Sequence, residues 1–138
     1  MIDIEPVENR GEELGKLIDR EFNEYAKDNG VSCDYRPFNF VAKVDGKVVG
    51  IIDGNSYYDE VHIGDLIVVK EYRHNHIGSQ LVRKVEETFT AKGFKKFNLS
   101  TYEFQAPEFY KKLGYNLEFV RENKDDPRLN RYFFSKEV

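Results

Sequence analysis

The chain has 138 residues, of which 40% are hydrophobic and 33% charged, and its formal net charge is −4. This composition is too apolar for a disordered chain, and the length suits one domain with its own core. The negative charge excludes broad attraction to nucleic acid or to an anionic membrane, and no apolar run approaches the roughly 18 to 20 residues of a membrane helix. Because the first ten residues also lack a basic segment followed by an apolar run, we expect a single cytoplasmic domain over residues 1–138.

Neither the single cysteine nor the lysine cluster predicts a functional site. The one cysteine, Cys33, cannot form an internal disulfide, which agrees with a reducing compartment, and we interpret it as a small buried side chain. Lys92, Lys95 and Lys96 form the nearest approach to a basic patch, and we interpret them as a solvated turn.

In chain order, residues 2–4 predict a short strand, and a helix follows. Its apolar residues recur at helical spacing, and Asn29-Gly30 ends it. They are Leu14, Leu17, Ile18, Phe22, Tyr25 and Ala26. A loop with Pro37 leads to strands over residues 38–44 and 47–57, which the tight turn Asp45-Gly46 joins as an antiparallel hairpin.

After a second turn at Asp59-Glu60, residues 61–69 predict a strand. Its last four residues are all apolar, which indicates burial on both faces. From Ile77 an apolar stripe predicts the clearest helix of the chain, which Gly93 ends. Its members are Leu81, Val82, Val85 and Phe89, and Arg83, Lys84, Glu86 and Glu87 lie opposite.

The remaining elements are short. Residues 97–102 alternate as a strand, residues 106–113 predict a helix that Gly114 stops, and residues 115–122 and 130–135 predict two last strands. The order strand, helix, strand over residues 61–102 implies a crossover and a parallel pair, whereas the hairpins imply antiparallel pairs. We therefore expect a mixed sheet in an α/β or α+β layer fold.

One turn stands out between the apolar strand and the amphipathic helix. It reads Arg73-His74-Asn75-His76-Ile77-Gly78-Ser79. A turn that leads into a helix presents unpaired backbone N–H groups and the positive end of the helix dipole, so it can hold a pyrophosphate. It is neither a Walker loop nor a dinucleotide-binding fingerprint.

The segment from Asp65 to Tyr115 resembles the cofactor-binding half of the GNAT N-acetyltransferase family. That family carries an apolar strand, the pattern Gln/Arg-x-x-Gly-x-Gly/Ala and an amphipathic helix. Here Arg73 opens the pattern, His76 replaces its first glycine, and Gly78 follows. Histidine is among the residues that tolerate a positive φ. A later family signature resembles residues 105–115, Gln-Ala-Pro-Glu-Phe-Tyr-Lys-Lys-Leu-Gly-Tyr.

The resemblance implies a fold and a cofactor. We expect a mostly antiparallel sheet of six to seven strands with three to four flanking helices, in which the family's second helix is reduced to a loop. Acetyl-coenzyme A is the implied co-substrate. The turn at residues 73–79 would hold its pyrophosphate, and the backbone of Leu66, Ile67 and Val68 would hold its pantetheine arm and polarise the thioester. Glu103 stands where many members have a cofactor-contacting asparagine.

The resemblance also implies catalytic residues. Tyr110 occupies the place of the tyrosine that protonates the leaving thiolate, a role that suits a hydroxyl protonated at neutral pH. His62, eleven residues before Arg73, is a candidate base for the amine, and its side chain is expected on the strand face of Leu66 and Val68. Asp65, Glu60 or a water molecule are alternative bases.

Other chemistries find less support. His74 and His76 lack neighbouring Cys or carboxylate ligands, so we expect no metal. No Gly-x-Ser-x-Gly elbow or Cys/His pair favours a covalent acyl-enzyme, so transfer is expected to be direct.

The function that the resemblance implies is acetyl transfer to a primary amine of a small molecule or peptide. The alternative is a non-catalytic module that binds an acyl-coenzyme A or a protein on the same fold. The acceptor's identity is not encoded in a motif, and a homodimer is compatible with the family. An acidic cluster at Asp59-Glu60, beside Tyr57 and Tyr58, would favour a cationic acceptor, although a solvated turn is the simpler interpretation.

Overall fold

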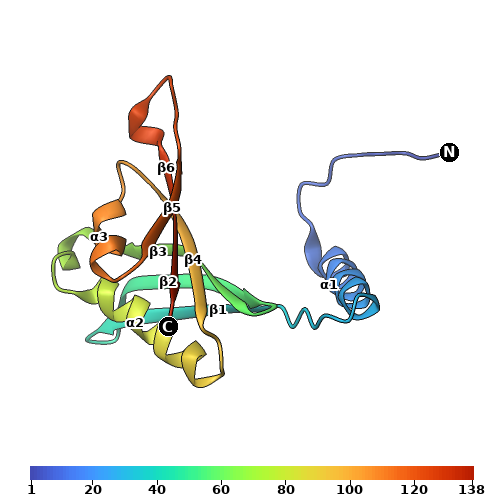
Figure 1. Cartoon of the computed structure of the whole chain (residues 1–138), viewed down its shortest axis with the longest axis horizontal. Helices are drawn as coiled ribbons and strands as arrows, with labels where there is room; N and C mark the ends of the chain where they lie inside the picture. Colours follow the sequence, from blue (N-terminus) through green and yellow to red (C-terminus); the bar gives the residue numbers. More distant parts are fainter.

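A computed structural model describes residues 1–138 as one mixed sheet with helices (Figure 1). The elements are α1 (Gly11–Asp28), β1 (Arg36–Val44), β2 (Lys47–Tyr57), β3 (Glu60–Val68), η1 (Lys70–Tyr72), α2 (Ile77–Ala91), β4 (Lys96–Tyr102), α3 (Pro107–Lys112), β5 (Asn116–Arg121), η2 (Pro127–Leu129) and β6 (Arg131–Glu137). The strand order is β1-β2-β3-β4-β6-β5, and only the β3–β4 pair is parallel. The predicted mixed, mostly antiparallel sheet and its crossover are confirmed.

The turns form where the sequence supplies residues that accept positive φ. Asp45 and Gly46 have φ values of 50° and 78°, as a two-residue hairpin turn requires. Tyr58, with φ of 52°, carries the turn between β2 and β3, so that turn begins before the predicted Asp59-Glu60. No helix forms between α1 and β1, as expected.

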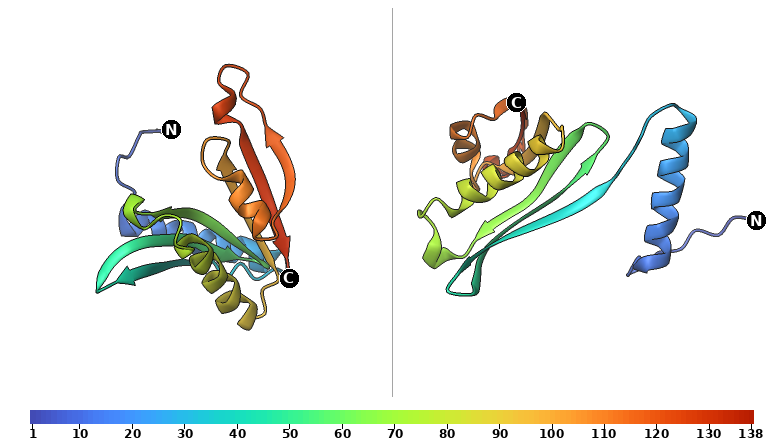
Figure 2. Two further views of the ribbon diagram at one scale, coloured as in Figure 1. Left: turned by 90° about the vertical axis from the view of Figure 1, so that its left-hand side faces the viewer. Right: turned by 90° about the horizontal axis from the view of Figure 1, so that it is seen from below.

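The core lies between one face of the sheet and the helices α2 and α3 (Figure 2). Phe97 and Phe134 of the central strands are fully buried there, and the α2 residues Val82 and Val85 pack onto them with no exposed surface. The amphipathic pattern of α2 therefore predicts the buried stripe correctly. This packing fixes the start of α2 over the sheet.

One charged residue of α2 departs from that pattern. Glu86, expected opposite the apolar stripe, is half-buried and lies 3.2 Å from Nζ of Lys136 on β6. The hydroxyl of Tyr115 donates to the same carboxylate over 2.8 Å, and Lys136 also donates to the carbonyl of Leu113. This network ties α2 to β6 and to the turn after α3.

Two expectations are wrong. Residues 2–4 form no strand, because they lie in extended chain with no neighbouring strand. The apolar run at residues 66–69 is not buried on both faces, since Ile67 is 56% exposed. No helix of the chain covers that face of the sheet, because α1 lies beyond the end of the sheet (Figures 1 and 2).

No helix is both long and apolar enough to cross a membrane.

Candidate active site

The strands β3 and β4 separate from each other in the middle of the sheet. They pair in parallel only at Glu60–Lys96, Val61–Phe97 and His62–Asn98, although β3 continues to Val68 and β4 to Tyr102. Beyond the last pair, the two facing edges have no partner strand. Backbone N–H and C=O groups left unpaired in this way can bind an extended molecule as an added strand would. We call this opening the splay.

A β-bulge in β3 borders the splay. Two residues, Gly64 and Asp65, lie opposite the single residue Asp53 of β2. The Asp53 carboxylate accepts a hydrogen bond from the Asp65 N–H over 2.7 Å, and a Cβ on Gly64 would lie 2.7 Å from the same oxygen. A side chain at position 64 would therefore displace the Asp53 carboxylate that caps the bulge, and the extra residue shifts the alternation of all later side chains.

This shift corrects the predicted position of His62. Leu66 pairs with the core residue Ile52, so it faces α2, and Val68 lies against Gly78 of α2. His62 precedes the bulge and faces the opposite side of the sheet, beside Asn55 and Asn98. The expectation that His62 shares a face with Leu66 and Val68 assumed strict alternation and is wrong.

The turn at residues 73–79 has the geometry of an anion site. His74 and His76 have φ values of 68° and 61°, so His76 occupies the left-handed conformation in place of glycine. The N–H groups of Ile77, Gly78 and Ser79 donate to no acceptor in the protein, and no side chain caps the helix. Together with the dipole of the 15-residue helix α2, they form a positive pole that suits a phosphate group.

Three side chains of this turn stabilise the turn itself. The Ser79 hydroxyl donates to the His76 carbonyl over 2.9 Å, and Nδ2 of Asn75 donates to the carbonyl of Tyr72 over 3.2 Å. Nε of Arg73 donates to the carbonyl of Val68 over 2.9 Å, which joins the turn to the end of β3. The backbone of the turn therefore stays available for a ligand, while these side-chain atoms are engaged.

Helix α3 contacts the start of α2 through Phe109, a residue to which the sequence motifs assign no role. The ring of Phe109 lies over Gly78, close enough that a Cβ added there would be in van der Waals contact with Cζ of the ring at 3.4 Å. Phe109 also meets Tyr110 edge to face, with centroids 5.0 Å apart. Phe109 thereby links the position of Tyr110 to that of the turn.

Tyr110 combines a buried ring with an unpaired hydroxyl. The residue is 7% exposed and packs against Tyr115 and Phe134, with ring centroids 5.9 and 6.2 Å away. Its hydroxyl makes no hydrogen bond. Because every fully buried side-chain oxygen of the chain has a hydrogen-bond partner, the Tyr110 oxygen is still accessible from outside the core. Burial raises the pKa of Tyr110 to about 12. The group therefore keeps its proton at neutral pH and can donate it.

On the other face, His62 belongs to a chain of hydrogen bonds. Its Nδ1 lies 2.6 Å from Oδ1 of Asn98, and Nδ2 of Asn98 donates to Glu60 over 3.4 Å. Because the amide nitrogen is used on Glu60, the amide oxygen accepts from His62, and Nδ1 carries the hydrogen. Nε2 is then the nitrogen with a free lone pair. The alternation of residues 97–102 predicts that the Asn98 side chain faces away from the core. No sequence pattern predicts its contact with His62.

The remaining candidates are engaged elsewhere. The Glu103 carboxylate accepts a hydrogen bond from the Tyr132 hydroxyl over 3.0 Å. Asp65 is one of the two bulge residues and is exposed. Gln105, from the second signature, caps the end of β4, because its side-chain oxygen accepts a hydrogen bond from the Tyr102 N–H over 3.0 Å.

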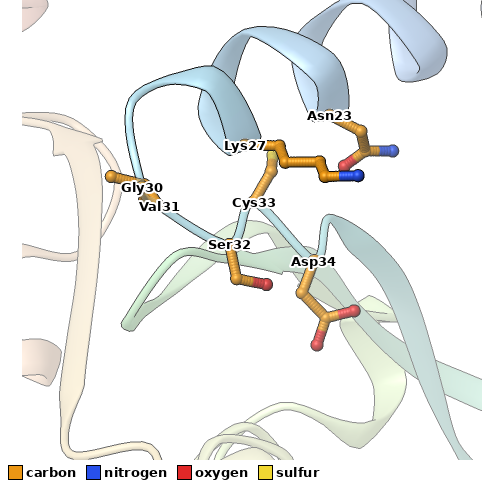
Figure 3. Close-up of a pocket in the computed structure, with 7 residues that line it drawn as sticks. All are labelled: Asn23, Lys27, Gly30, Val31, Ser32, Cys33 and Asp34. Carbon is orange, nitrogen blue, oxygen red and sulfur yellow. The ribbon is translucent and has the colours of Figure 1, made fainter.

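No three His, Cys, Asp or Glu side chains are grouped as a metal site. A cavity of about 530 Å³ lies at the α1–β1 connection, away from the splay (Figure 3).

Comparisons with known proteins identify the family and the fold of the chain. The sequence model of the acetyltransferase (GNAT) family matches residues 5–115. A crystal structure of an acetyltransferase from Bacillus cereus is 30% identical, with a TM-score of 0.77 over 97% of this chain and 98% of that one. A protein from Agrobacterium tumefaciens, proposed to be an acetyltransferase, is 17% identical with a TM-score of 0.81 over 99% and 100%. A PaiA N-acetyltransferase from Thermoplasma acidophilum, in complex with coenzyme A, is 20% identical with a TM-score of 0.63 over 91% and 71%.

Proposed function

Since the chain belongs to the acetyltransferase (GNAT) family, we propose that it transfers the acetyl group of acetyl-coenzyme A directly to a primary amine of a small molecule or peptide. The observation that carries this proposal is the splay between β3 and β4, which opens beside the unpaired N–H groups at the start of α2. One extended thioester with a pyrophosphate at its end matches both features.

In this proposal the coenzyme lies along β3. The free N–H groups of residues 77–79, with those of the preceding turn, bind the pyrophosphate. The pantetheine arm enters the splay and pairs with the backbone around Leu66, Ile67 and Val68. A backbone N–H at this edge polarises the thioester carbonyl as the tetrahedral intermediate forms. The side chains of these three residues contribute packing only, so apolar replacements are tolerated.

The two sides of the sheet then have different tasks. Tyr110 lies on the side of α2 and α3 and donates its proton to the coenzyme A thiolate as the C–S bond breaks. His62 faces the opposite side, from which the amine approaches, and Nε2 accepts a proton from the ammonium group or through a water molecule. The amine nitrogen forms the new C–N bond, and the proton that it then loses restores the Tyr110 hydroxyl through solvent. The products are the acetylated amine and free coenzyme A.

The neighbourhood of His62 bears on the acceptor. Asp59 and Glu60 lie at the start of β3, and Asp59 forms an ion pair with Lys96 over 2.8 Å. The Lys96 partner lowers the pKa of the Asp59 carboxyl through a hydrogen bond, so Asp59 stays ionised near neutral pH. The Glu60 carboxylate accepts a hydrogen bond from the Asn98 amide over 3.4 Å and forms no ion pair. A negative group at this end of β3 favours a cationic amine.

Titration calorimetry with acetyl-coenzyme A, followed by thiol release against a panel of primary amines, tests the proposal. We expect saturable binding and release of one thiol per acetylated amine, with the product identified by mass spectrometry. Binding without turnover on any amine would favour the alternative, a non-catalytic acyl-coenzyme A module. Absence of binding would contradict both.

A further inference from the structure

Helix α1 exposes an apolar stripe that packs on nothing within its own chain. Its apolar residues recur at helical spacing on one side, and among the residues of α1 only Ala26 is buried. The stripe consists of Leu14 (38% exposed), Leu17 (42%), Ile18 (37%), Phe22 (60%) and Tyr25 (74%). Most helical stability in proteins comes from packing such an apolar face against another surface. The stripe therefore requires a partner surface.

The sheet offers a matching bare surface on the face opposite α2 and α3. Val41, Ile51 and Ile67 are directly paired across β1, β2 and β3, so their side chains form one row on that face. Val41 is 47% and Ile67 56% exposed. At the far end of the same face, Phe133 stacks on Phe119 with centroids 4.4 Å apart. We call this surface the open face.

The connection after α1 is held in place and directs the helix away from its own open face. Ala26 and Cys33 are buried, and the Val31 N–H donates to the Ala26 carbonyl over 2.8 Å, which fixes the end of α1 (Figure 3). The Tyr58 N–H donates to the Cys33 carbonyl over 2.8 Å, which fastens the connection to the β2–β3 turn. Beyond this anchor, α1 lies past the end of the sheet (Figures 1 and 2).

We propose that the chain forms a reciprocal homodimer in which α1 of each copy lies on the open face of the other. Both halves of the contact are present on one chain, so a two-fold exchange buries two stripes and two open faces at once. Charge complementarity supports this contact. Helix α1 is acidic, with six acidic and three basic residues. Arg121 and Arg131, each 5.1 Å from the Phe133 ring, place cations at one end of the open face.

The exchange also completes the acceptor side of the site, a consequence that rests on the proposed function. His62 and Asn98 face the same side as Val41, Ile51 and Ile67. A partner helix on the open face would then form a wall of the space from which the amine approaches. Each active site would combine the splay of one chain with α1 of the other.

Mass and cross-linking measurements test the dimer without reference to activity. Light scattering on the full chain should give the mass of two chains, and a monomer would overturn the proposal. For the exchange itself, unlabelled and ¹⁵N-labelled chains are refolded together and treated with a carbodiimide, which joins carboxylates to lysines. We expect mixed-isotope peptides that link α1 carboxylates to Lys43 or Lys47 of the other copy. Links from α1 only within one chain, or only to surfaces other than the sheet, would overturn it.

A matched pair of variants locates the contact. Phe22 lies in the stripe, whereas Asn23 is exposed on the other side of α1, and both accept a substitution by glutamate. Phe22→Glu should raise the dimer dissociation constant by about 30-fold or more, as loss of a central aromatic contact does. Asn23→Glu should leave it unchanged. Equal dissociation constants for the two variants, with helix content confirmed by circular dichroism, would contradict docking through the stripe.

Discussion

The Nδ1 atom of His62 lies 2.6 Å from the Oδ1 atom of Asn98, and this contact joins two strands at the last residue pair before the splay. Asn98 thereby assigns the hydrogen of the imidazole to Nδ1 and leaves the Nε2 lone pair free. In the proposed mechanism Asn98 is a positioning residue, since it acts through His62.

Replacing Asn98 by leucine should lower kcat/KM about 10- to 100-fold, because the imidazole loses both its orientation and its preferred tautomer. The affinity for acetyl-coenzyme A should stay the same. Asn98→Asp, which restores an acceptor for Nδ1–H, should recover part of the rate.

Replacing His62 by alanine should lower the rate and remove the limb of the pH–rate profile that reports the general base. An unchanged profile in His62→Ala would assign the base to Asp65, Glu60 or water.

Tyr110→Phe should slow acetyl transfer by about 10²-fold or more, the usual contribution of a positioned acid. The fold should persist, because the ring packing remains and the hydroxyl has no hydrogen bond to lose. Thermal unfolding and coenzyme titration serve as controls. Normal turnover in a folded Tyr110→Phe protein would remove this hydroxyl from the mechanism.

Alkaline stability should report the burial of the same residue. The pKa of Tyr110 rises from 10.0 to about 12 on folding because burial disfavours the phenolate. Between these values the unfolded chain loses the proton while the folded chain keeps it, so the stability contribution is complete below pH 10 and is lost as pH rises toward about 12. The slope is about 1.4 kcal/mol per pH unit for one group. Urea titrations from pH 9 to about 11 should show a shallower decline in Tyr110→Phe than in the wild type.

The left-handed residue His76 offers a test of the turn. His76→Val should weaken acetyl-coenzyme A binding about 10-fold, because a β-branched residue strains this conformation by roughly 1–2 kcal/mol. His76→Gly should bind at least as tightly as the wild type, since glycine adopts a φ of 61° freely. Lys84→Val, at an exposed position within α2, is the matched control. If His76→Val and Lys84→Val bind the coenzyme equally well, the conformation of residue 76 does not matter for binding.

Lys136→Met should destabilise the fold by about 2–4 kcal/mol, because it leaves the half-buried Glu86 without its cation. The double variant Lys136→Met/Glu86→Leu should regain most of that loss, since removing both charges also removes the uncompensated one. Urea unfolding of the two variants measures the difference. Equal stabilities of the single variant and the wild type would show that the pair contributes nothing.

Local patterns predicted the elements of this fold well, and long-range relationships less so. The stripe of α2 and the turn at Asp45-Gly46 are encoded by neighbouring residues, and both form as expected. The bulge at Gly64-Asp65 depends on Asp53 in another strand, so strict alternation placed His62 on the wrong face. Likewise, the exposure of Ile67 depends on where α1 lies, which no spacing within either segment reveals.

Hydrogen–deuterium exchange with and without acetyl-coenzyme A tests whether the coenzyme binds between the splay and the start of α2. We expect saturating coenzyme to slow exchange at the free N–H groups of residues 77–79 and along residues 63–68 of β3, which border the splay. The β1–β2 hairpin, which lies away from the splay, should keep its exchange rates. Protection confined to other segments, such as the cavity at the α1–β1 connection, would contradict the proposed coenzyme site.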